Sequence, residues 1–579
     1  MTSDVVRAAA VPVIHNGECL VLKQYRKVLL LKVPYCAHPD TLGEDENFRT
    51  KSTFRPVPSL ALVSLFAFVE KYKTFPYELK AVDVNLEAYT QPGEPVDPSA
   101  YPQLLERAIR ENDYDVLALS AMFVFNVRWV TDAVRLSRQY HPQAKIIIGG
   151  GYPTLFPERS LADHGIDDAV MGEGESAFLH ILNRYNQHQD PAFEQTFPLE
   201  SYASKDQDGA ITVHQGRKHF LDLALLPLPA WQALDIERYF RLSGERVLPI
   251  QGSRGCPYNC TYCSTYVAWG RKLRYKPVEN VIKEIEDLNQ RYQRPVLYFS
   301  DDNLSFSKEW IVSFLNTLLA KGLTMDATVS NFSVKHLDEE IIALLKRAGV
   351  KEFGIAIETG SPEMQQKIRK RLNFDKVRQV IQIMKDHDLH CHACWMVGFP
   401  NETLEQIQMT FDLAQEMKAH SNQFLTVLPY PGTDLFQEAR SQGLLMLDDK
   451  DLDKFDYRKS EYIKSDQWTY PQLQEMIYDA NILTNFLNCP SLDTPRGRDH
   501  LLEFLQNLLR RLPEHVVGHI VVGHLYKTRG ETAASSEHFA LARQLMDKPS
   551  LKKTFDKYMS WDYPALRDYH EYLGQAPGC

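Results

Sequence analysis

The chain has 579 residues, a formal net charge of −10, 44% hydrophobic residues and 24% charged residues. This length predicts two to four domains, and the composition is that of an ordinary globular protein. The negative charge argues against binding to nucleic acid, and no apolar run is long enough to span a membrane. Nine cysteines without a secretory signal indicate the reducing cytoplasm.

Residues 1–190 alternate strands with helices. Strands are predicted at 27–35, 77–87, 114–125 and 144–154, and helices at 59–72, 100–112 and 127–140. Such alternation predicts an α/β domain with a Rossmann-like, mostly parallel sheet. Ligands of these sheets bind at the carboxyl ends of the strands, where Gly149, Gly150 and Gly151 occur.

The range 191–245 is rich in polar and turn-forming residues and is predicted to be a linker. A second alternating series over 246–440 predicts a partial (β/α)6 barrel, with strands at 246–255, 295–303, 325–333, 352–360, 390–400 and 422–432. Helical patterns dominate 441–579, which we expect to form a helical domain that caps the site. Within it, 518–546 has the offsets of one tetratricopeptide-like helix pair, expected to pack on the barrel.

Three cysteines in the sequence "GCPYNCTYC" raise the question of what they bind: Cys256, Cys260 and Cys263. A structural zinc site normally has four protein ligands, and no partner pair follows closely. A four-iron cluster takes one ligand per iron, so three thiolates would leave one iron open for another ligand. The other C-x-x-C, Cys391 and Cys394, lies in an apolar strand pattern whose side chains alternate between faces, which indicates core packing.

The C-x-x-x-C-x-x-C spacing, with Tyr262 before the third cysteine and a barrel strand before the first, resembles the radical S-adenosylmethionine (radical SAM) superfamily. The resemblance implies that the three cysteines hold a [4Fe-4S] cluster. It also implies that the open iron binds the methionine part of S-adenosylmethionine, which one-electron reduction cleaves to a 5′-deoxyadenosyl radical.

Other segments resemble the cofactor-binding strands of the same superfamily. The resemblance implies that Asp301 or Asp302 contacts the methionine amino group, and that Ser330 and Asn331 lie at a ribose position. Two further residues are expected at the cofactor: Tyr262 within the cysteine motif, and Glu358 at the end of the fourth barrel strand. The alternative for each is a strand-end side chain that merely caps a helix.

The N-terminal sheet resembles the cobalamin-binding domain that precedes the radical domain in one large subfamily. Ser120 ends one strand, and Gly149 to Gly151 follow nearly thirty residues later. Backbone without side chains could line a slot for the nucleotide tail of cobalamin, and Ser120 would donate to that tail. The alternative is a nucleotide-binding Rossmann domain, but no G-x-G-x-x-G follows the first strand. The Asp-x-His-x-x-Gly motif is also missing, which implies cobalt without a histidine ligand. His38 is interpreted as a surface or loop histidine rather than a ligand.

The resemblance implies a cobalamin-dependent methyltransferase that acts on an unactivated carbon of a small molecule or a peptide. It also implies an electron donor such as flavodoxin or ferredoxin. Two alternatives remain: a cobalamin-dependent radical enzyme for cyclisation, oxidation or ring rearrangement, and a cobalamin or redox sensor without catalytic activity.

Overall fold

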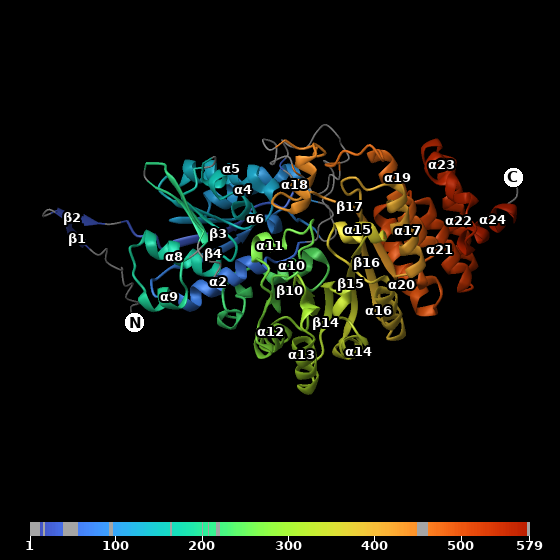
Figure 1. Cartoon of the computed structure of the whole chain (residues 1–579), viewed down its shortest axis with the longest axis horizontal. Coiled ribbons are helices and arrows are strands. Elements are labelled where there is room, and N and C mark those ends of the chain that lie inside the picture. Colours follow the sequence, from blue (N-terminus) through green and yellow to red (C-terminus); the bar gives the residue numbers. More distant parts are fainter. Residues whose placement is uncertain are drawn as a thin grey trace.

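The computed structural model describes residues 12–15, 18–21, 23–36, 38, 56–91, 96–162, 165–199, 201–206, 208–215, 220–448, 455 and 461–575. Three parts follow one another along the long axis of the molecule: an α/β part, a second α/β part and a group of helices at the C-terminal end (Figure 1). A short antiparallel hairpin, β1 (Pro12–His15) and β2 (Glu18–Val21), precedes the first part.

The N-terminal part is a seven-stranded sheet with the order β4-β3-β5-β6-β7-β8-β9, in which β4 to β7 are parallel. Its strands are β3 (Lys27–Lys32), β4 (Glu78–Asp83), β5 (Val116–Ser120), β6 (Lys145–Gly149), β7 (Asp168–Val170), β8 (Ser201–Lys205) and β9 (Ile211–Gln215). Its helices are α2 (Leu60–Tyr72), α3 (Val84–Glu87), α4 (Tyr101–Arg110), α5 (Val127–Tyr140), α6 (Gly151–Leu155), α7 (Pro157–Ala162), α8 (Glu175–Tyr185) and α9 (Pro191–Thr196). The predicted parallel sheet is confirmed.

Two predictions in this part were wrong in detail. The strand expected over 77–87 stops at Asp83, because the Asp83 carboxylate accepts a hydrogen bond from the Asn85 backbone and caps α3. The range 191–245 is more than a linker, because β8 and β9 form an antiparallel hairpin that extends the sheet. Its polar residues near Gly209, which has a φ of 86°, are the turn of that hairpin.

The central part is a six-stranded parallel sheet in the order β10-β13-β14-β15-β16-β17, which confirms the predicted partial barrel. The strands are β10 (Val247–Ile250), β13 (Val296–Phe299), β14 (Asp326–Phe332), β15 (Val350–Glu358), β16 (His390–Val397) and β17 (Ser421–Thr426). The helices are α10 (Ile236–Ser243), α12 (Val278–Arg291), α13 (Lys308–Ala320), α14 (Glu339–Ala348), α15 (Pro362–Lys367), α16 (Phe374–Asp386), α17 (Leu404–Met417), α18 (Asp434–Ser441) and α19 (Tyr470–Ile482).

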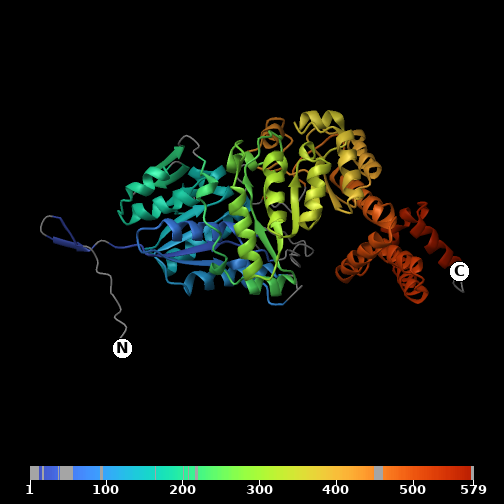
Figure 2. The same ribbon diagram turned by 90° about the horizontal axis from the view of Figure 1, so that it is seen from below.

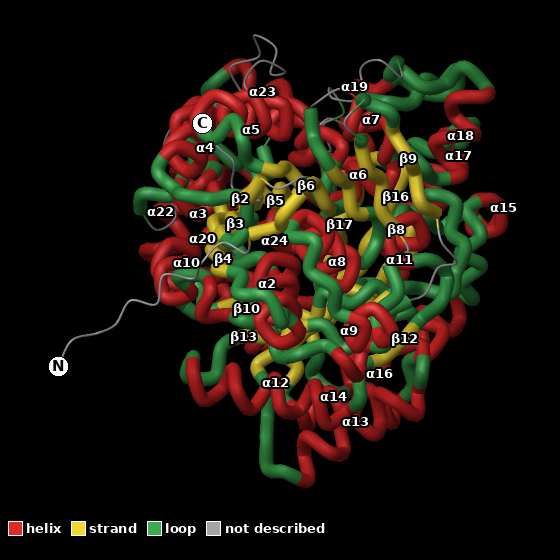
Figure 3. Tube along the Cα trace, turned by 90° about the vertical axis from the view of Figure 1, so that its left-hand side faces the viewer, coloured by secondary structure: helices red, strands yellow, loops and turns green. Residues whose placement is uncertain are grey.

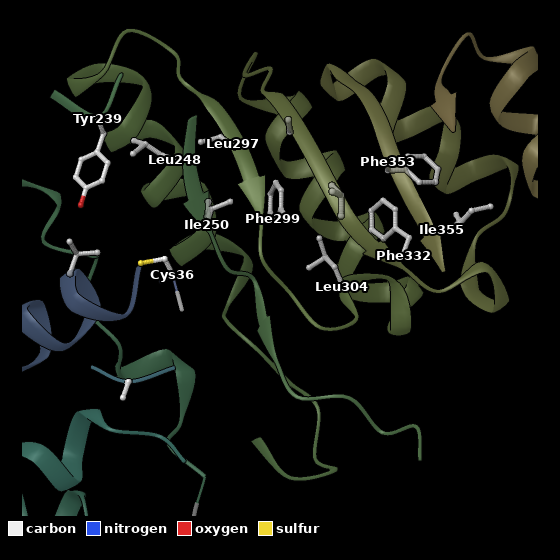
Figure 4. Packing of buried hydrophobic residues seen from close by; sticks show 14 of the residues in the cluster. Cys36, Tyr239, Leu248, Ile250, Leu297, Phe299, Leu304, Phe332, Phe353 and Ile355 are labelled. Carbon is white, nitrogen blue, oxygen red and sulfur yellow. The ribbon is translucent and has the colours of Figure 1, made fainter. Parts of the chain in front are cut away.

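Burial alternates strictly along β16, so that Cys391 is buried against the helices whereas Cys394 lies on the other, partly exposed face. The two cysteines therefore do not converge, as the alternating pattern predicted. A tight core joins the two sheets. Cys36, at the end of the first parallel strand, belongs to the same buried cluster as Leu248 and Ile250 of β10 (Figure 4). Seen from the N-terminal side, strands occupy the centre of the molecule and helices surround them (Figure 3).

The C-terminal helices form a core of their own. They are α20 (Pro495–Arg511), α21 (Val516–Thr528), α22 (Thr532–Met546), α23 (Pro549–Phe555) and α24 (Pro564–Gln575). The predicted helix pair is confirmed as α21 and α22. It was expected to pack on the barrel, but its buried residues belong to a cluster with α20, α23 and α24, which we call the C-terminal bundle. The bundle protrudes from the barrel (Figure 2).

The bundle and the segment between α19 and α20 join the barrel at the amino ends of two strands. Asn485 exchanges hydrogen bonds with the backbone of Asn422, near the start of β17, and the ring of His500 in α20 contacts His390, the first residue of β16. The carboxyl ends of the strands lie at the opposite edge, where the Trp468 indole donates to the Glu402 carbonyl. The bundle therefore does not cap the predicted site. Among the described residues after 441, Ile463 belongs to the buried cluster against which Tyr262 packs.

Candidate active site

The three predicted cysteines lie on one loop between the end of β10 and the short helix α11 (Thr265–Trp269). Cys256, Cys260 and Cys263 are partly exposed free thiols. The loop is tied to the barrel because the Thr261 backbone donates to the Ile368 carbonyl over 3.2 Å. Burial raises the pKa of the Cys256 and Cys263 thiols, and their neighbouring thiols raise it further. The structure thus brings the three sulfurs close to one another.

The chemistry of this donor set fits an iron–sulfur cluster, whose usual ligands are thiolates. Within the described part of the chain, no group of three or more His, Cys, Asp or Glu side chains is arranged to bind one metal ion. A cubic cluster binds each thiolate to a different iron, so its ligands do not need to converge on one point. Three thiols on a single loop match that requirement.

The two aspartates after β13 have their carboxylates occupied by the cysteine loop. Asp301 accepts hydrogen bonds from the backbones of Gly252 and Ser253 and, over 2.6 Å, from the Ser253 hydroxyl. It is 1% exposed, and burial raises its pKa to about 6. Asp302 accepts from the Gly255 backbone and the Thr265 hydroxyl. These contacts favour the alternative of side chains that organise neighbouring backbone over a direct contact with a cofactor.

Asn303, the next residue, is a site residue that the sequence did not indicate. Its side-chain nitrogen donates to the Cys256 sulfur over 3.7 Å. Its side-chain oxygen is buried and has no partner among the described residues. An orphaned buried acceptor is costly, and it fits a bound ligand that supplies an N–H donor. The signal that could have identified it is a third polar residue directly after a buried strand.

Glu358 and Tyr262, both predicted, lie side by side. Glu358 ends β15 with a φ of 76°, a conformation that is strained for a side-chain-bearing residue. Its carboxylate accepts from the Tyr262 hydroxyl over 2.8 Å and pairs with the Lys370 ammonium over 3.2 Å. Burial acts to lower the pKa of Lys370, but the Glu358 carboxylate outweighs it and the pKa is raised. Lys370, which holds Glu358 in place, was not indicated by the sequence.

Ser330 and Asn331 lie on β14 where its register with β15 shifts between Val329 and Phe332. Only their backbone is described, and their contact with a cofactor stays a prediction.

The second predicted group lies at the carboxyl edge of the N-terminal sheet. Ser120 pairs in register with Lys32 on one side and with Gly149 on the other. The Ser120 hydroxyl has no hydrogen-bond partner within the described chain, and a side chain at Gly149 would meet no atom within 4 Å. These two positions fit a ligand that enters between the strands.

Gly150 and Gly151 are glycines for a different reason. A Cβ atom on Gly150 would overlap the Ala121 carbonyl oxygen, and one on Gly151 would overlap that of Met122. Gly150 also has a φ of 111°. The close approach of two backbones therefore requires both glycines, whether or not a ligand is bound.

His38 is engaged with α5. Its ring lies 4.3 Å from that of Trp129, and its Nε2 lies 2.9 Å from the Asp132 carboxylate. His38 lies outside helices and strands, as expected of a loop histidine, but it is only 7% exposed, so the expectation of a surface histidine was wrong. The loop after the third parallel strand carries Phe123 stacked on Phe125, with ring centroids 5.0 Å apart. Most of the loop that follows the first parallel strand, residues 36–48, lies outside the described residues.

The two groups of predicted residues adjoin across the domain interface. Helix α6, which begins at Gly151, packs against α11, which follows the three cysteines. Two ion pairs join the same parts: Arg254, two residues before Cys256, donates to Glu175 at the start of α8 over 2.6 Å, and Arg274 donates to Glu173. The Arg254 guanidinium is 6% exposed. The cysteine loop is thus anchored to the N-terminal sheet as well as to the barrel.

Comparison with known proteins identifies both domains. The family model for the radical SAM superfamily matches residues 250–414, and that for the B12-binding domain matches residues 59–182. The chain is 26% identical over 476 residues to cytidylyl-2-hydroxyethylphosphonate methyltransferase of Streptomyces wedmorensis, which covers 73% of this chain and 83% of that protein.

Two further similarities extend this result. The chain is 24% identical over 373 residues to anaerobic magnesium-protoporphyrin IX monomethyl ester cyclase of Rubrivivax gelatinosus, covering 63% of this chain and 65% of that protein. The structure of the cobalamin-dependent S-adenosylmethionine radical enzyme OxsB, with aqua-cobalamin and S-adenosylmethionine bound, has the same fold. Its TM-score is 0.60 at 13% identity, over 96% of this chain and 85% of OxsB. Among the described residues, no helix has the length and apolar character needed to cross a membrane.

Proposed function

We propose that the protein transfers a methyl group to an unactivated carbon of a small molecule. The chain belongs to the cobalamin-dependent radical S-adenosylmethionine enzymes, because it joins a B12-binding domain to a radical SAM domain. The observation that carries the proposal is the contact between α6 and α11. This contact brings the carboxyl edge of the N-terminal sheet, where Gly149 lies, next to the cysteine loop of the barrel. A methyl donor and a radical generator must act on the same carbon, so their sites have to adjoin.

The residues have distinct roles in this proposal. Cys256, Cys260 and Cys263 hold the [4Fe-4S] cluster, Asn303 and Glu358 contact S-adenosylmethionine, and Ser120 and Gly149 accommodate cobalamin. When bound, these cofactors supply a methyl group and a carbon-centred radical. The protein itself fixes the three sites relative to one another.

Three sets of contacts hold these sites in place. The Thr261–Ile368 hydrogen bond holds the cysteine loop on the barrel. Tyr262 and Lys370 hold the Glu358 carboxylate in one orientation. Glu358 is only 6% exposed, so little water competes for these two contacts. The buried ion pair between Arg254 and Glu175 fixes the cysteine loop relative to the N-terminal sheet.

The test uses the holoenzyme, reconstituted without oxygen with iron, sulfide and cobalamin. It is incubated with a reductant, S-adenosylmethionine labelled with ¹³C in its methyl group, and a small-metabolite extract of the cells that make it. The proposal expects a product that carries the labelled methyl group, together with S-adenosylhomocysteine and 5′-deoxyadenosine. 5′-Deoxyadenosine with no labelled product would contradict methyl transfer.

The second candidate function is cyclisation or oxidation without methyl transfer, favoured by the similarity to the Rubrivivax gelatinosus cyclase. It predicts a substrate mass that changes by loss of hydrogen or gain of oxygen, with no label incorporated. The same experiment therefore separates the two functions.

We further propose that the enzyme works in the cytoplasm, that peptides are a second possible substrate class, and that a flavodoxin or a ferredoxin supplies its electrons. The unpaired thiols support the first point, since a [4Fe-4S] cluster on three cysteines requires reduced thiolates.

A further inference from the structure

Basic side chains surround the outer side of the cysteine loop. The Arg271 guanidinium donates to the Tyr258 carbonyl over 3.4 Å and lies 4.7 Å from the centroid of the Tyr266 ring. The Lys335 ammonium lies 4.8 Å from the centroid of the Tyr258 ring and donates to the Lys370 carbonyl over 2.8 Å. Arg371 follows Lys370 in the chain. We call Arg271, Lys335 and Arg371 the basic rim.

The rim cations differ from the other basic groups nearby, because they are exposed and lack an acidic partner. Lys370 is paired with Glu358, and Arg369 with Asp434 over 2.5 Å. Within the residues that the structure describes, no carboxylate lies within salt-bridge distance of any of the three rim cations.

The rim concentrates positive charge on a chain whose net charge is −10. Lys335 is close enough to Lys370 and Arg371 that, besides burial, these like charges lower its pKa. Like charges held together without counter-charges oppose folding, so they are expected where an external partner supplies the negative charge. The rim is built from three separate segments, namely the loop after α11, the short 3-10 helix at 334–336 and the residues after α15.

The rim also lies beside the cysteine loop, because Arg271 donates to the carbonyl of Tyr258 within that loop. Cys260 is partly exposed and interacts electrostatically with both Lys335 and Lys370. On the proposed function, a cluster bound there has to receive one electron from outside the chain.

We propose that the basic rim docks an acidic one-electron carrier protein that reduces the cluster. The proposal rests on the proposed function. In the step, one electron moves from the reduced flavin or iron–sulfur group of the carrier to the oxidised cluster. The carrier is oxidised by one electron, and no bond forms or breaks. Electrostatic complementarity of this kind acts mainly on the rate of association.

The test compares two charge-reversal variants of the holoenzyme. One carries Lys335→Glu and Arg371→Glu in the rim. The matched control carries Lys552→Glu and Lys553→Glu, two exposed residues of α23 in the C-terminal bundle, and has the same net charge. Reduction of the cluster is followed by its absorbance after anaerobic mixing with an acidic bacterial flavodoxin in its hydroquinone form. Dithionite serves as a small reductant that needs no docking face.

The rim variant is expected to be reduced by flavodoxin at least about tenfold more slowly than the unmodified enzyme at low salt. The difference should vanish near about 0.5 M salt, where charges are screened beyond a few ångströms. Reduction by dithionite should keep its rate, and the control variant should behave like the unmodified enzyme.

Three results would overturn the proposal. One is an unchanged rate with flavodoxin, and another is an equal slowing in the control variant. The third is an equal slowing with dithionite, which would show that the substitutions act on the cluster itself. Binding of a short DNA duplex that is lost in the rim variant, with flavodoxin reduction intact, would assign the rim to nucleic acid instead. Cluster reduction is measured without substrate, so failure of methyl transfer would leave this result interpretable.

Discussion

At the scale of single residues, the three glycines after β6 have two different roles. Gly150 and Gly151 are fixed by the close approach of the backbone at Ala121 and Met122, whereas the side-chain position of Gly149 faces open space beside Ser120. A bulky residue at Gly150 would therefore disturb the fold, and loss of cobalamin binding in such a variant would say little about a slot.

Gly149→Val is the informative substitution. A Cβ atom at this position meets no atom within 4 Å, so we expect the fold and the cluster to be kept while the space for a ligand is filled. We expect cobalamin binding, measured by the corrin absorbance retained after gel filtration, to weaken at least about tenfold, in the range that one misplaced group causes at a packed site. The iron content should not change. Cobalamin binding at the unmodified level would contradict the placement of the ligand beside Gly149.

Some site residues could be predicted from the sequence, and others depend on contacts that form only in the folded chain. Cysteine spacing is a local property, so the cluster loop could be predicted from the sequence alone. Asn303 and Lys370 could not, because their roles depend on contacts with Cys256 and Glu358 that are distant in the chain. Asp301 was expected at the methionine amino group, but Gly252 and Ser253 of the cysteine loop donate to its carboxylate, and these contacts depend on the fold.

At the scale of elements, the ion pair between Arg254 and Glu175 couples the strand before the cysteine loop to the first residue of α8. Both side chains are buried, and removing the Glu175 charge leaves Arg254 with the more distant Glu173 carboxylate, 3.8 Å away and shared with Arg274. We expect Glu175→Gln to lower the free energy of unfolding by about 3–5 kcal/mol, as loss of one member of a buried pair does. Hydrogen exchange at α8 and β11 (Ser253–Arg254) should report the loosened interface.

The matched control for this prediction is Glu416→Gln, which removes an exposed pair with Arg378. It should change hydrogen exchange and stability little, because surface pairs are screened by water. Equal effects of the two substitutions would show that Arg254 and Glu175 do not couple the domains.

A second element, the junction between the barrel and the C-terminal bundle, should be sensitive to pH. Burial lowers the pKa of His390 to about 3 and that of His420 to about 4. Other ionisable groups at the junction are His392, His500, Lys385 and Asp388. In the unfolded chain both histidines take up a proton near pH 6.5, whereas in the fold they stay neutral. Stability is therefore expected to fall as the pH is lowered from about 6.5 to about 4.

Thermal unfolding between pH 7 and pH 4 measures this dependence. His390→Gln should reduce the slope of melting temperature against pH in that range, since one titrating group is removed. An unchanged slope would contradict a role of the junction histidines.

At the scale of the whole molecule, continuous apolar strands and helix-length amphipathic patterns made the two parallel sheets predictable. The hairpin of β8 and β9 was missed because its sequence is polar, and one side of an edge hairpin faces water. The position of the C-terminal bundle was also missed. Amphipathic helices show that a core exists, but they do not show which neighbour supplies it.

The separate core of the bundle has a measurable consequence. Leu525 is completely buried within α21, and Leu525→Ala should destabilise the bundle by about 2–5 kcal/mol. Faster hydrogen exchange should appear in α20 to α24, while β3, β5 and β6 keep their protection. Faster exchange in those strands as well would show that the bundle and the α/β parts unfold as one unit.

The proposed function places an iron–sulfur cluster on three cysteines beside a cobalamin site in one chain. It is tested most directly by elemental analysis of iron, zinc and cobalt in protein purified without oxygen and supplied with cobalamin. We predict about four iron atoms and about one cobalt atom per chain, with the iron lost in Cys256→Ala, Cys260→Ala and Cys263→Ala. Zinc in place of iron, or cobalt that is missing after cobalamin is supplied, would contradict the claim.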